Sequence, residues 1–400
     1  MARRLQVSKR SKEIPTSGIR KMFDLAQKYN DVINLSIGEP DFQTPTHIFE
    51  AAIQAMKAGY THYTTNAGFL EFREAASEKL RKENHIDADP ATEIMATAGA
   101  MGGLSLAMLT VIDPGDEVLI PNPGFPNFAS QVFLASGRSI PYPLKEENKF
   151  SANPDDIVER ITSKTKAIVI NSPSNPTASM LKEKELKSIA DIALEHDLLV
   201  ISDEAYEAIL YDGARHISMA SLPEMKERTI SIFTFSKTYA MTGWRIGYVV
   251  ANKEIIDGML EFQEHILVHP SSISQMAAIA ALRGPKDHIQ MMVREYAERR
   301  KLITNELNTM PGITCLKPEG AFYVFPNIKE LGISSTDMAI NLLEKARIIT
   351  VPGTAFGEYG EGYIRISYST SKEKITEAMS KMRRTLQELI KKKRNCLKEN

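Results

Sequence analysis

Short apolar segments alternate with longer helical patterns between about residue 94 and residue 251. Seven of these segments are predicted to be strands: Ile94 to Thr97, Glu117 to Pro121, Arg138 to Leu144, Ala167 to Asn171, Leu198 to Ser202, Thr229 to Phe235 and Ile246 to Ala251. Helical periodicity is clearest at Lys182 to His196, where apolar residues recur on one face. Strands that alternate with helices predict an α/β fold, in which helices cover both faces of a mostly parallel sheet.

The pattern changes after Pro285. We expect a long charged helix at Asp287 to Met310, a glycine-punctuated strand pair around Ile313 to Pro326, and helices near Asp337 to Ala346 and Lys372 to Lys392. These elements predict a smaller α+β domain at residues 286–400, beside a large domain at residues 46–285 that carries the sheet. Residues 1–45 fit neither unit cleanly, and we expect an N-terminal arm that forms part of the small domain.

Composition excludes several classes of protein. The 400 residues are 43% hydrophobic and 25% charged, which is ordinary for a globular protein, and the net charge of −1 gives no general attraction to nucleic acid. The two cysteines, Cys315 and Cys396, are too few for a disulfide framework and lack metal-ligand spacing, so no metal site is expected. The longest apolar stretch, Leu104 to Ile112, is too short to span a bilayer. We expect a cytoplasmic protein with no membrane or nucleic-acid partner.

Polar residues follow several predicted strands, at the edge where open parallel sheets bind ligands. Thr97 to Gly103 follows the first strand and leads into a helical pattern, so that small residues let backbone N–H groups face an anion. Asn171 to Thr177 follows the fourth strand, and its two X-Pro steps predict a rigid, extended loop that presents the Asn175 amide. Either segment alone also fits an ordinary tight turn.

Two further segments carry charged residues. Asp203-Glu204-Ala205-Tyr206 continues the fifth strand, and a carboxylate there needs a positive partner, although an acidic helix cap is an equally good explanation. Lys237 follows the sixth strand with Thr234 and Ser236 before it, and Arg245 comes immediately before the seventh. A strand-end lysine alone is as often a solvated charge. Taken together, the segments predict one crevice for a ligand that carries a phosphate, a basic ring nitrogen and a carbonyl carbon.

With these residues identified, the sequence resembles the class I aminotransferases among the fold-type I pyridoxal-phosphate enzymes, in particular their archaeal and bacterial aspartate and aromatic subgroup. The resemblance covers nearly the whole chain, from the segment Ile33 to Phe42 to the segment Tyr363 to Tyr368. Its motifs are specific as a set: Asn175-Pro176-Thr177, Asp203-Glu204-Ala205-Tyr206, and Ser236-Lys237 followed by Met241-Thr242-Gly243-Trp244-Arg245-Ile246-Gly247. The resemblance implies a seven-stranded sheet and the cofactor pyridoxal 5′-phosphate, bound by the large domain.

The resemblance also implies roles for single residues in cofactor binding. Lys237 would be the Schiff-base lysine and proton shuttle, Asp203 would lie under the pyridine nitrogen, and Tyr206 and Asn175 would hydrogen-bond the phenolate oxygen of the ring. Phe125 matches the aromatic residue that stacks on the ring. The phosphate would be bound by Thr234, Ser236, Arg245 and the backbone of Gly99, Ala100 and Met101.

Three more matches concern the substrate and the assembly. Arg365 matches the arginine that pairs with the substrate α-carboxylate, helped by Gly38 and Asn175. Tyr63 matches a tyrosine that reaches the phosphate of the neighbouring subunit, which implies a homodimer with shared active sites. Two departures bear on loop geometry: Ala178 replaces a glycine often found after Asn-Pro-Thr, and Gly102-Gly103 is looser than the usual start of that helix.

The expected reaction moves the amino group of an L-amino acid to a 2-oxo acid such as 2-oxoglutarate by a ping-pong mechanism. Aspartate or an aromatic amino acid is the expected donor, but alanine or methionine stays open because no second arginine can be assigned to a dicarboxylate side chain. A pyridoxal-phosphate C–S lyase or decarboxylase on the same scaffold is the alternative, since these enzymes share the cofactor residues. A non-catalytic cofactor-binding regulator would carry a DNA-binding segment, and residues 1–45 lack a helix-turn-helix pattern.

Overall fold

The computed structural model describes residues 7–15 and 18–399. Side chains are described up to residue 391 with the exception of Ile19, so the expectation for Cys396 falls outside the described residues, as do residues 1–6 and 16–17 of the expected arm. The strands are β1 Ile33–Asn34, β2 Ile94–Thr97, β3 Glu117–Asn122, β4 Arg138–Pro143, β5 Thr165–Asn171, β6 Leu199–Asp203, β7 Thr229–Thr234, β8 Gly247–Val250, β9 Tyr323–Val324, β10 Ile348–Ile349, β11 Val351–Pro352 and β12 Ile364–Ser367.

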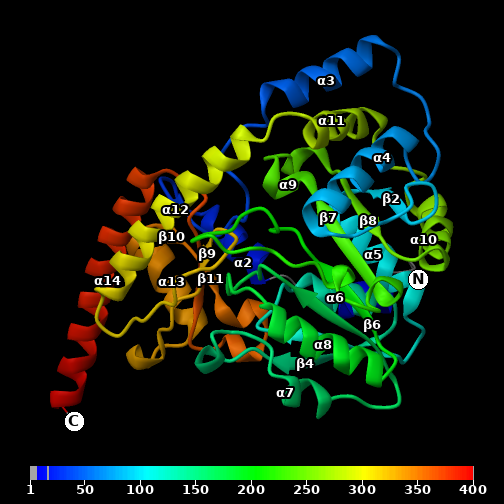
Figure 1. The fold of residues 1–400 in the computed structure, drawn as a ribbon. Coiled ribbons are helices and arrows are strands. Elements are labelled where there is room, and N and C mark those ends of the chain that lie inside the picture. Colours follow the sequence, from blue (N-terminus) through cyan, green and yellow to red (C-terminus); the bar gives the residue numbers. More distant parts are fainter. Residues whose placement is uncertain (1–6, 16–17, 400) are drawn as a thin grey trace, which may run out of the picture.

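The α-helices of the described chain alternate with these strands (Figure 1). They are α1 Lys9–Glu13, α2 Gly18–Ala26, α3 Thr46–Lys57, α4 Leu70–Lys79, α5 Gly99–Val111, α6 Asn127–Leu134, α7 Pro154–Val158, α8 Glu183–Glu195, α9 Phe235–Thr238, α10 Lys253–Ile266, α11 Ser272–Arg283, α12 Asp287–Asn308, α13 Ser335–Ala346 and α14 Lys372–Glu399. A π-helical turn, Leu80–Asn84, extends α4.

The seven predicted strands form one sheet in the order β2-β8-β7-β6-β5-β3-β4. Only β8 runs antiparallel to its neighbours β2 and β7 in this sheet, and the pairs β7–β6, β6–β5, β5–β3 and β3–β4 are parallel. The predicted segment ends differ from the observed ones by two residues at most. The predicted α/β fold is therefore confirmed.

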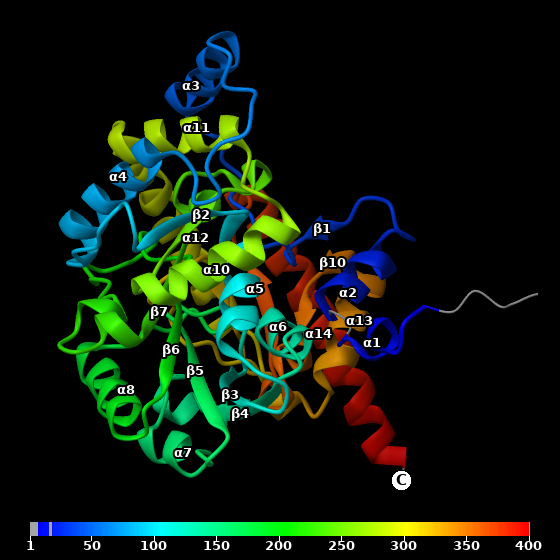
Figure 2. The ribbon, with the colours of Figure 1, turned by 90° about the vertical axis from the view of Figure 1, so that its right-hand side faces the viewer.

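Helices cover both faces of the sheet, as Figure 2 shows. Alternate residues of each central strand pack on opposite sides because side chains in a strand point to opposite faces. Ile201 and Ile232 pack with α5, α6 and α10, whereas Val200 packs with α7 and α8, and Phe233 packs with α4 and α11. Both faces of β6 and β7 are thus buried, so that even their polar residues Ser202, Thr229 and Ser231 are buried.

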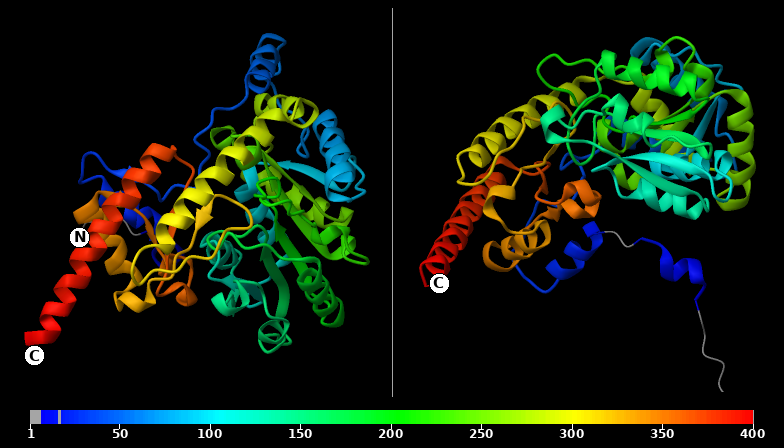
Figure 3. Two further views of the ribbon diagram at one scale, coloured as in Figure 1. Left: turned by 60° about the vertical axis from the view of Figure 1, so that its left-hand side comes forward. Right: turned by 90° about the horizontal axis from the view of Figure 1, so that it is seen from below.

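A second core lies around α12, α13, α14 and the short strands. β9, β11 and β12 form an antiparallel sheet in the order β11-β12-β9, while β1 near the N-terminus pairs in parallel with β10. The helices α12 and α14 lie side by side (Figure 3). The expected helices after Pro285 are confirmed, whereas the domain boundaries at residues 45 and 285 stay predictions. Among the described residues, no helix is long and apolar enough to cross a membrane.

The strand pair expected around Ile313 to Pro326 was wrong. Only Tyr323–Val324 forms a strand there, and it pairs with β12; Thr314 makes a single bridge to Asn327. The chain between them bonds to the loop after β5 instead: the backbone N–H groups of Glu319 and Gly320 donate to the carbonyl of Ala178 at 2.9 and 3.2 Å. Pro318 has no N–H to offer a ladder. This segment therefore ties the second core to the loop after β5.

Candidate active site

A cavity of about 300 Å³ lies at the carboxyl ends of β5, β6 and β7. Its wall also includes the start of α5, the segment after β1, and single residues from β9 and β12. All the site residues expected from the sequence line it except Gly99 and Tyr63. The chain thus brings together residues that are more than 300 positions apart, such as Ser36 and Arg365.

Lys237 lies on the short helix α9, directly after β7. The Thr234 side chain caps this helix by accepting from the Ser236 N–H at 3.2 Å, which fixes the start of the helix that carries Lys237. The Lys237 Nζ donates to the Gly38 carbonyl at 2.6 Å. Burial lowers the pKa of Lys237 to about 8; Glu39 and Asp203 oppose this shift, while Arg365 and Arg245 add to it. The neutral amine of Lys237 therefore forms at a lower pH than that of an exposed lysine.

Asp203 is the last residue of β6. Its Oδ1 accepts from the Ala205 N–H at 3.1 Å, and its backbone carbonyl accepts from the Asn171 side chain at 3.0 Å. Burial raises the pKa of Asp203 to about 6; the Ala205 N–H and Lys237 lower it, while the charge of Glu204 raises it further. Among the described residues, Asp203 has no ion-pair partner, and a protonated ring nitrogen would supply the missing positive charge.

The loop after β5 holds Asn175 but is not extended, so that expectation was wrong. The Ala178 N–H donates to the Ser174 carbonyl at 3.0 Å and closes a turn, because these backbone groups are buried and need partners. The backbone N–H of Asn175 donates to Asn171 Oδ1 at 2.8 Å, which fixes the Asn175 backbone. Ala178 has φ of 56°, a conformation that favours the glycine it replaces. The substitution is accommodated without opening the loop.

Arg365 is the largest fully buried side chain among the described residues. Its Nη1 donates to Asn175 Oδ1 at 2.9 Å, its Nη2 donates to the Ser36 carbonyl, and its guanidinium carbon lies 4.6 Å from the centroid of the Tyr323 ring. Its Nε is buried and has no partner among the described residues. Burial lowers the pKa of the guanidinium. A buried cation with an unused N–H is well suited to a substrate carboxylate.

Tyr323 is a cavity residue that the sequence did not reveal. Its hydroxyl lies 2.7 Å from the hydroxyl of Tyr206, and burial raises the pKa of both phenols, so both stay protonated. A Cβ atom added to Gly38 would lie 1.9 Å from the Tyr323 hydroxyl oxygen, so only glycine fits there. Tyr323 reaches the cavity from β9, far from any of the recognised motifs, and no local pattern marks it.

One end of the cavity is suited to an anion. Gly99, the first residue of α5, has φ of 70°, and a Cβ atom there would lie 2.8 Å from Arg245 Nη2. The hydroxyls of Thr234 and Ser236 lie 2.9 Å apart at the same end, and Arg245 Nη1 donates to the Thr242 carbonyl at 2.8 Å. A helix N-terminus, two hydroxyls and a guanidinium together fit a phosphate. Gly102 and Gly103 lie within α5 and do not interrupt it.

The remaining expected residues differ in position. Phe125 lines the cavity and packs edge-on against Phe128. Tyr63 lies outside the cavity, 85% exposed, with its ring edge-on to His269. Within one chain Tyr63 therefore does not reach the cavity, and its expected contact with the phosphate of a neighbouring subunit stays a prediction.

Comparisons with known proteins agree with this geometry. The family model described as aminotransferase class I and II matches residues 30–382. The chain is 48% identical to an aspartate aminotransferase from Pyrococcus abyssi and 46% identical to aromatic-amino-acid aminotransferase 2 from Thermococcus litoralis; each match covers 96% of this chain and 99% of the relative. The crystal structure of an aromatic aminotransferase from Pyrococcus horikoshii is similar with a TM-score of 0.88 and 48% identity, over 92% of this chain and 99% of that one. The chain belongs to the class I and II aminotransferases.

Proposed function

We propose that this aminotransferase uses pyridoxal 5′-phosphate to move the amino group of an aromatic L-amino acid or aspartate to a 2-oxo acid such as 2-oxoglutarate, in a ping-pong reaction. One observation carries the proposal: Lys237, Asp203 and Arg365 line the same cavity of about 300 Å³. A lysine with a lowered pKa, an acid with a raised pKa and a buried guanidinium are the three groups that the reaction requires.

The residues present fit the cofactor group by group. The start of α5, Thr234, Ser236 and Arg245 would hold its phosphate, and Asp203 would keep a proton on its ring nitrogen. Tyr206 and Asn175 would bond its ring oxygen, and Phe125 would pack on its ring. When bound, pyridoxal phosphate supplies an electron sink for the charge left by removal of a substrate α-proton.

The chain's own residues supply binding and proton transfer. The neutral Lys237 amine is a nucleophile toward a carbonyl carbon, and once free it can take a proton from the substrate α-carbon and return it at another atom. Arg365 orients the substrate through its α-carboxylate, since the guanidinium can bond both oxygens. The contact between Lys237 Nζ and the Gly38 carbonyl, at 2.6 Å, keeps the amine within the cavity.

The charges of the cavity favour an aromatic donor over aspartate. Among the described residues, its cationic side chains are Lys237, Arg245 and Arg365, and each has a proposed partner. No described cationic side chain of the cavity in this copy is therefore left to pair with a second carboxylate. Apolar residues such as Ile37 and Leu104 also line the wall. The Thermococcus litoralis relative is named for aromatic donors. We expect a higher kcat/KM for tyrosine or phenylalanine than for aspartate with 2-oxoglutarate; a faster reaction with aspartate would contradict this preference.

A homodimer is part of the proposal. Helix α3 projects from the body of the chain at the top of Figure 1. It exposes apolar side chains, and others are exposed at the end of α10: Phe49, Ile53, Met56, Ile266 and Leu267. Exposed apolar residues on a projecting helix support contact with another chain. Light scattering should give twice the mass of one chain, and a monomer that retains full activity would contradict shared sites.

A trapping experiment tests the proposed function directly. Borohydride treatment of the protein loaded with pyridoxal phosphate should fix the cofactor covalently to Lys237 Nζ, and peptide mapping should find the added mass there. Amino transfer from a donor to 2-oxoglutarate should be lost at the same time. Labelling spread over surface lysines, with transfer preserved, would contradict the proposal.

Replacing Arg365 by lysine should impair every donor to a similar extent. The ammonium group keeps the charge but cannot bond both carboxylate oxygens, so kcat/KM should fall by roughly 10²-fold for tyrosine and aspartate alike. The affinity for pyridoxal phosphate should change little, because Arg365 has no proposed contact with the cofactor phosphate. Equal kcat/KM values for the variant and the unmodified enzyme would show that another residue binds the α-carboxylate.

A further inference from the structure

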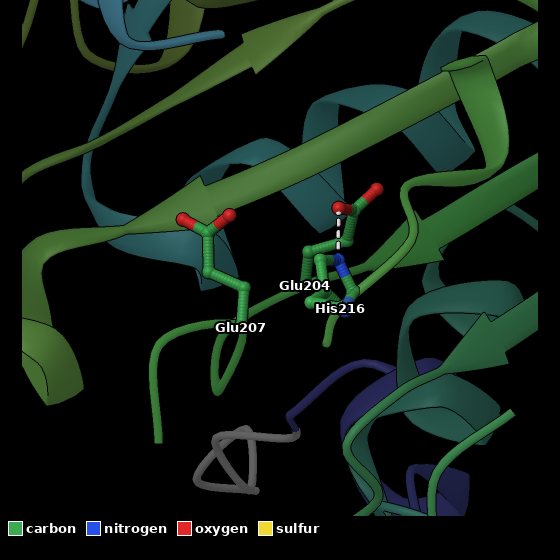
Figure 4. A group of neighbouring side chains, drawn as sticks. All are labelled: Glu204, Glu207 and His216. Atoms are coloured by element: carbon green, nitrogen blue, oxygen red, sulfur yellow. Dashed lines mark hydrogen bonds and ion pairs between the residues drawn. The ribbon is translucent and has the colours of Figure 1, made fainter. Parts of the chain in front are cut away.

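A second polar cluster lies behind β6, outside the cavity. Its members form one connected set of hydrogen bonds, which we call the rear network: Lys79, Asn84, Ser202, Glu204, Glu207, His216 and Ser218. Figure 4 shows three of them, with the contact between Glu204 and His216 drawn and the Glu207 carboxylate apart from that pair. None of these residues lines the cavity, and none has a role in the proposed reaction so far.

Side chains alternate between the two faces of β6, which places the rear network and the active site on opposite faces of the sheet. Ile201 packs on the α5 side of the sheet, so Asp203, two residues on, shares that side. Ser202 and Glu204 fall on the opposite side. The Glu204 N–H donates to the Ile232 carbonyl at 3.0 Å and extends the pairing of β6 with β7. A movement of Glu204 is therefore transmitted to Asp203 through the backbone.

The Glu204 carboxylate is fixed by three donors. It is 1% exposed, and its Oε2 accepts from His216 Nε2 at 2.6 Å and from Ser218 Oγ at 2.5 Å. Its Oε1 accepts from Ser202 Oγ at 3.0 Å. These bonds lower the pKa of Glu204 despite its burial, so it carries a negative charge.

Glu207, three residues after Glu204, is held by the other half of the rear network. Its carboxylate accepts from the Lys79 ammonium and, at 2.7 Å, from Asn84 Nδ2. Asn84 Nδ2 also lies 2.9 Å from Ser218 Oγ, which joins this half of the network to Glu204. Asp203 and Tyr206 line the cavity, whereas the residues that follow each of them, Glu204 and Glu207, are tied to the rear network.

A metal ion is a poor explanation for this cluster. Ligand atoms of Glu204, Glu207 and His216 lie within 4.8 Å of one another. Both carboxylates already accept hydrogen bonds, and the Lys79 ammonium contacts Glu207. A cation placed among them would meet that ammonium and would displace existing donors. The Lys79 ammonium already offsets one of the two carboxylates, and hydrogen-bond donors satisfy the other.

We infer that Glu204 is a positioning residue. The rear network holds Glu204 in place, which keeps Asp203 and Tyr206 facing the cofactor. The carboxylate of Glu204 also places a negative charge next to Asp203, on the opposite side of the sheet. The inference rests on the proposed function. Stability alone explains the network poorly, because apolar residues of similar volume commonly replace buried charge networks without loss of stability. The place of Glu204 in the chain explains the network better, since Glu204 directly follows Asp203, the residue that would keep a proton on the ring nitrogen.

The charge of Glu204 acts within a small set of neighbours. His216 lies beside it in the loop before Ser218, and the rest of the rear network adds Lys79 and Glu207. Two further groups feel its charge: Asp203 on β6 and the buried phenol of Tyr248 on β8. A negative charge favours protonation of neighbouring groups, so its removal should shift protonation equilibria in the cavity to lower pH.

The test compares Glu204→Gln with Glu117→Gln in the protein loaded with pyridoxal phosphate. Glu117 is a matched control: it is 5% exposed, accepts from Thr162 Oγ1 at 2.6 Å, and is the first residue of β3, at the end of the strand away from the cavity. In E204Q we expect kcat to fall by roughly 10- to 100-fold with a smaller change in KM, because small displacements of reacting groups are costly. The pH midpoint of the bound cofactor's visible absorbance should shift downward. E117Q should keep both values.

The outcomes separate the inference from the proposed function. If the unmodified protein binds pyridoxal phosphate and transfers amino groups, and E204Q matches E117Q in kcat and absorbance midpoint, the positioning role is overturned. If the unmodified protein does neither, the proposed function fails first. Should E204Q not fold, Ser218→Ala replaces it, since it removes one of the three donors and keeps the charge. A reduced kcat with an unchanged absorbance midpoint then supports the inference, and an unchanged kcat overturns it.

Discussion

Replacing Lys237 by alanine should lower kcat for amino transfer by roughly 10⁴-fold, since the variant loses both the nucleophile and the proton carrier. The absorbance of the lysine-bound cofactor should disappear with it. The proposed phosphate contacts do not involve the Lys237 side chain, so pyridoxal phosphate should still bind reversibly. Steady-state kinetics with tyrosine and 2-oxoglutarate, together with an absorbance spectrum of the loaded protein, measure both effects.

A second lysine provides the control for this prediction. Lys226 is half-buried, lies outside the cavity and pairs with Glu93 at 2.9 Å, so Lys226→Ala removes an ammonium without touching the site. Its turnover should stay within about twofold of the unmodified enzyme, because such ion pairs contribute little. A K237A protein with the turnover of K226A would refute the role of Lys237 and the proposed mechanism with it.

The central sheet was predictable because its strands are buried on both faces. β5 and β6 each contain an unbroken apolar run, residues 167–170 and 199–201, and each strand ends at a polar residue, Asn171 or Asp203. Local sequence therefore marks both the strand and the edge where ligands bind. Lys237 and Arg245 became interpretable for the same reason, since each adjoins a strand end at that edge.

The part of the site that comes from the second core was not predictable from local pattern. Tyr323 and Arg365 reach the cavity from β9 and β12, which pair with each other and bind the loops after β5 and β1. The bond between Arg365 and Asn175 spans 190 positions of sequence. Periodicity describes which face of an element is buried but not which distant element covers it. Arg365 was identified through family resemblance, and Tyr323 was missed.

The turn after β5 and the rear network show a related limit. Two X-Pro steps favour extended backbone, yet buried N–H and C=O groups bent the segment around Ser174 and Ala178 into a turn. Alternation along β6 places Glu204 opposite Asp203, but nothing in the local sequence indicates that His216 and Lys79 would meet the carboxylates there. Buried polar networks depend on tertiary contacts, so they are found only in the folded chain.

Replacing Asp203 by asparagine should lower kcat by roughly 10²- to 10³-fold. The asparagine oxygen can still accept from the Ala205 N–H, so the turn should keep its shape. The variant loses the negative charge that would keep a proton on the cofactor ring nitrogen, and electrostatic groups of this kind carry a large share of catalysis. Steady-state kcat with a saturating aromatic donor measures the loss, and an unchanged kcat would contradict the role of Asp203.

The same variant should be more stable than the unmodified protein when no cofactor is bound. The pKa of Asp203 is about 6 in the folded protein and 3.8 ordinarily, so the folded state holds this proton more tightly than the unfolded chain. Asp203 therefore destabilises the fold increasingly as pH rises from 3.8 to about 6, and the full cost remains above that range. D203N should gain about 3 kcal/mol in free energy of unfolding at pH 8 and almost nothing at pH 3.5.

Urea unfolding of both proteins at the two pH values tests this expectation, and pyridoxal phosphate provides its control. The cofactor binds the folded state, and its protonated ring nitrogen would pair with the Asp203 carboxylate but not with the asparagine amide. Added cofactor should therefore stabilise the unmodified protein more than D203N and narrow the difference at pH 8. A variant that is less stable at pH 8 without cofactor would show that Asp203 serves the fold. A variant that gains stability and loses turnover would show that this buried carboxylate is kept for catalysis at the expense of stability.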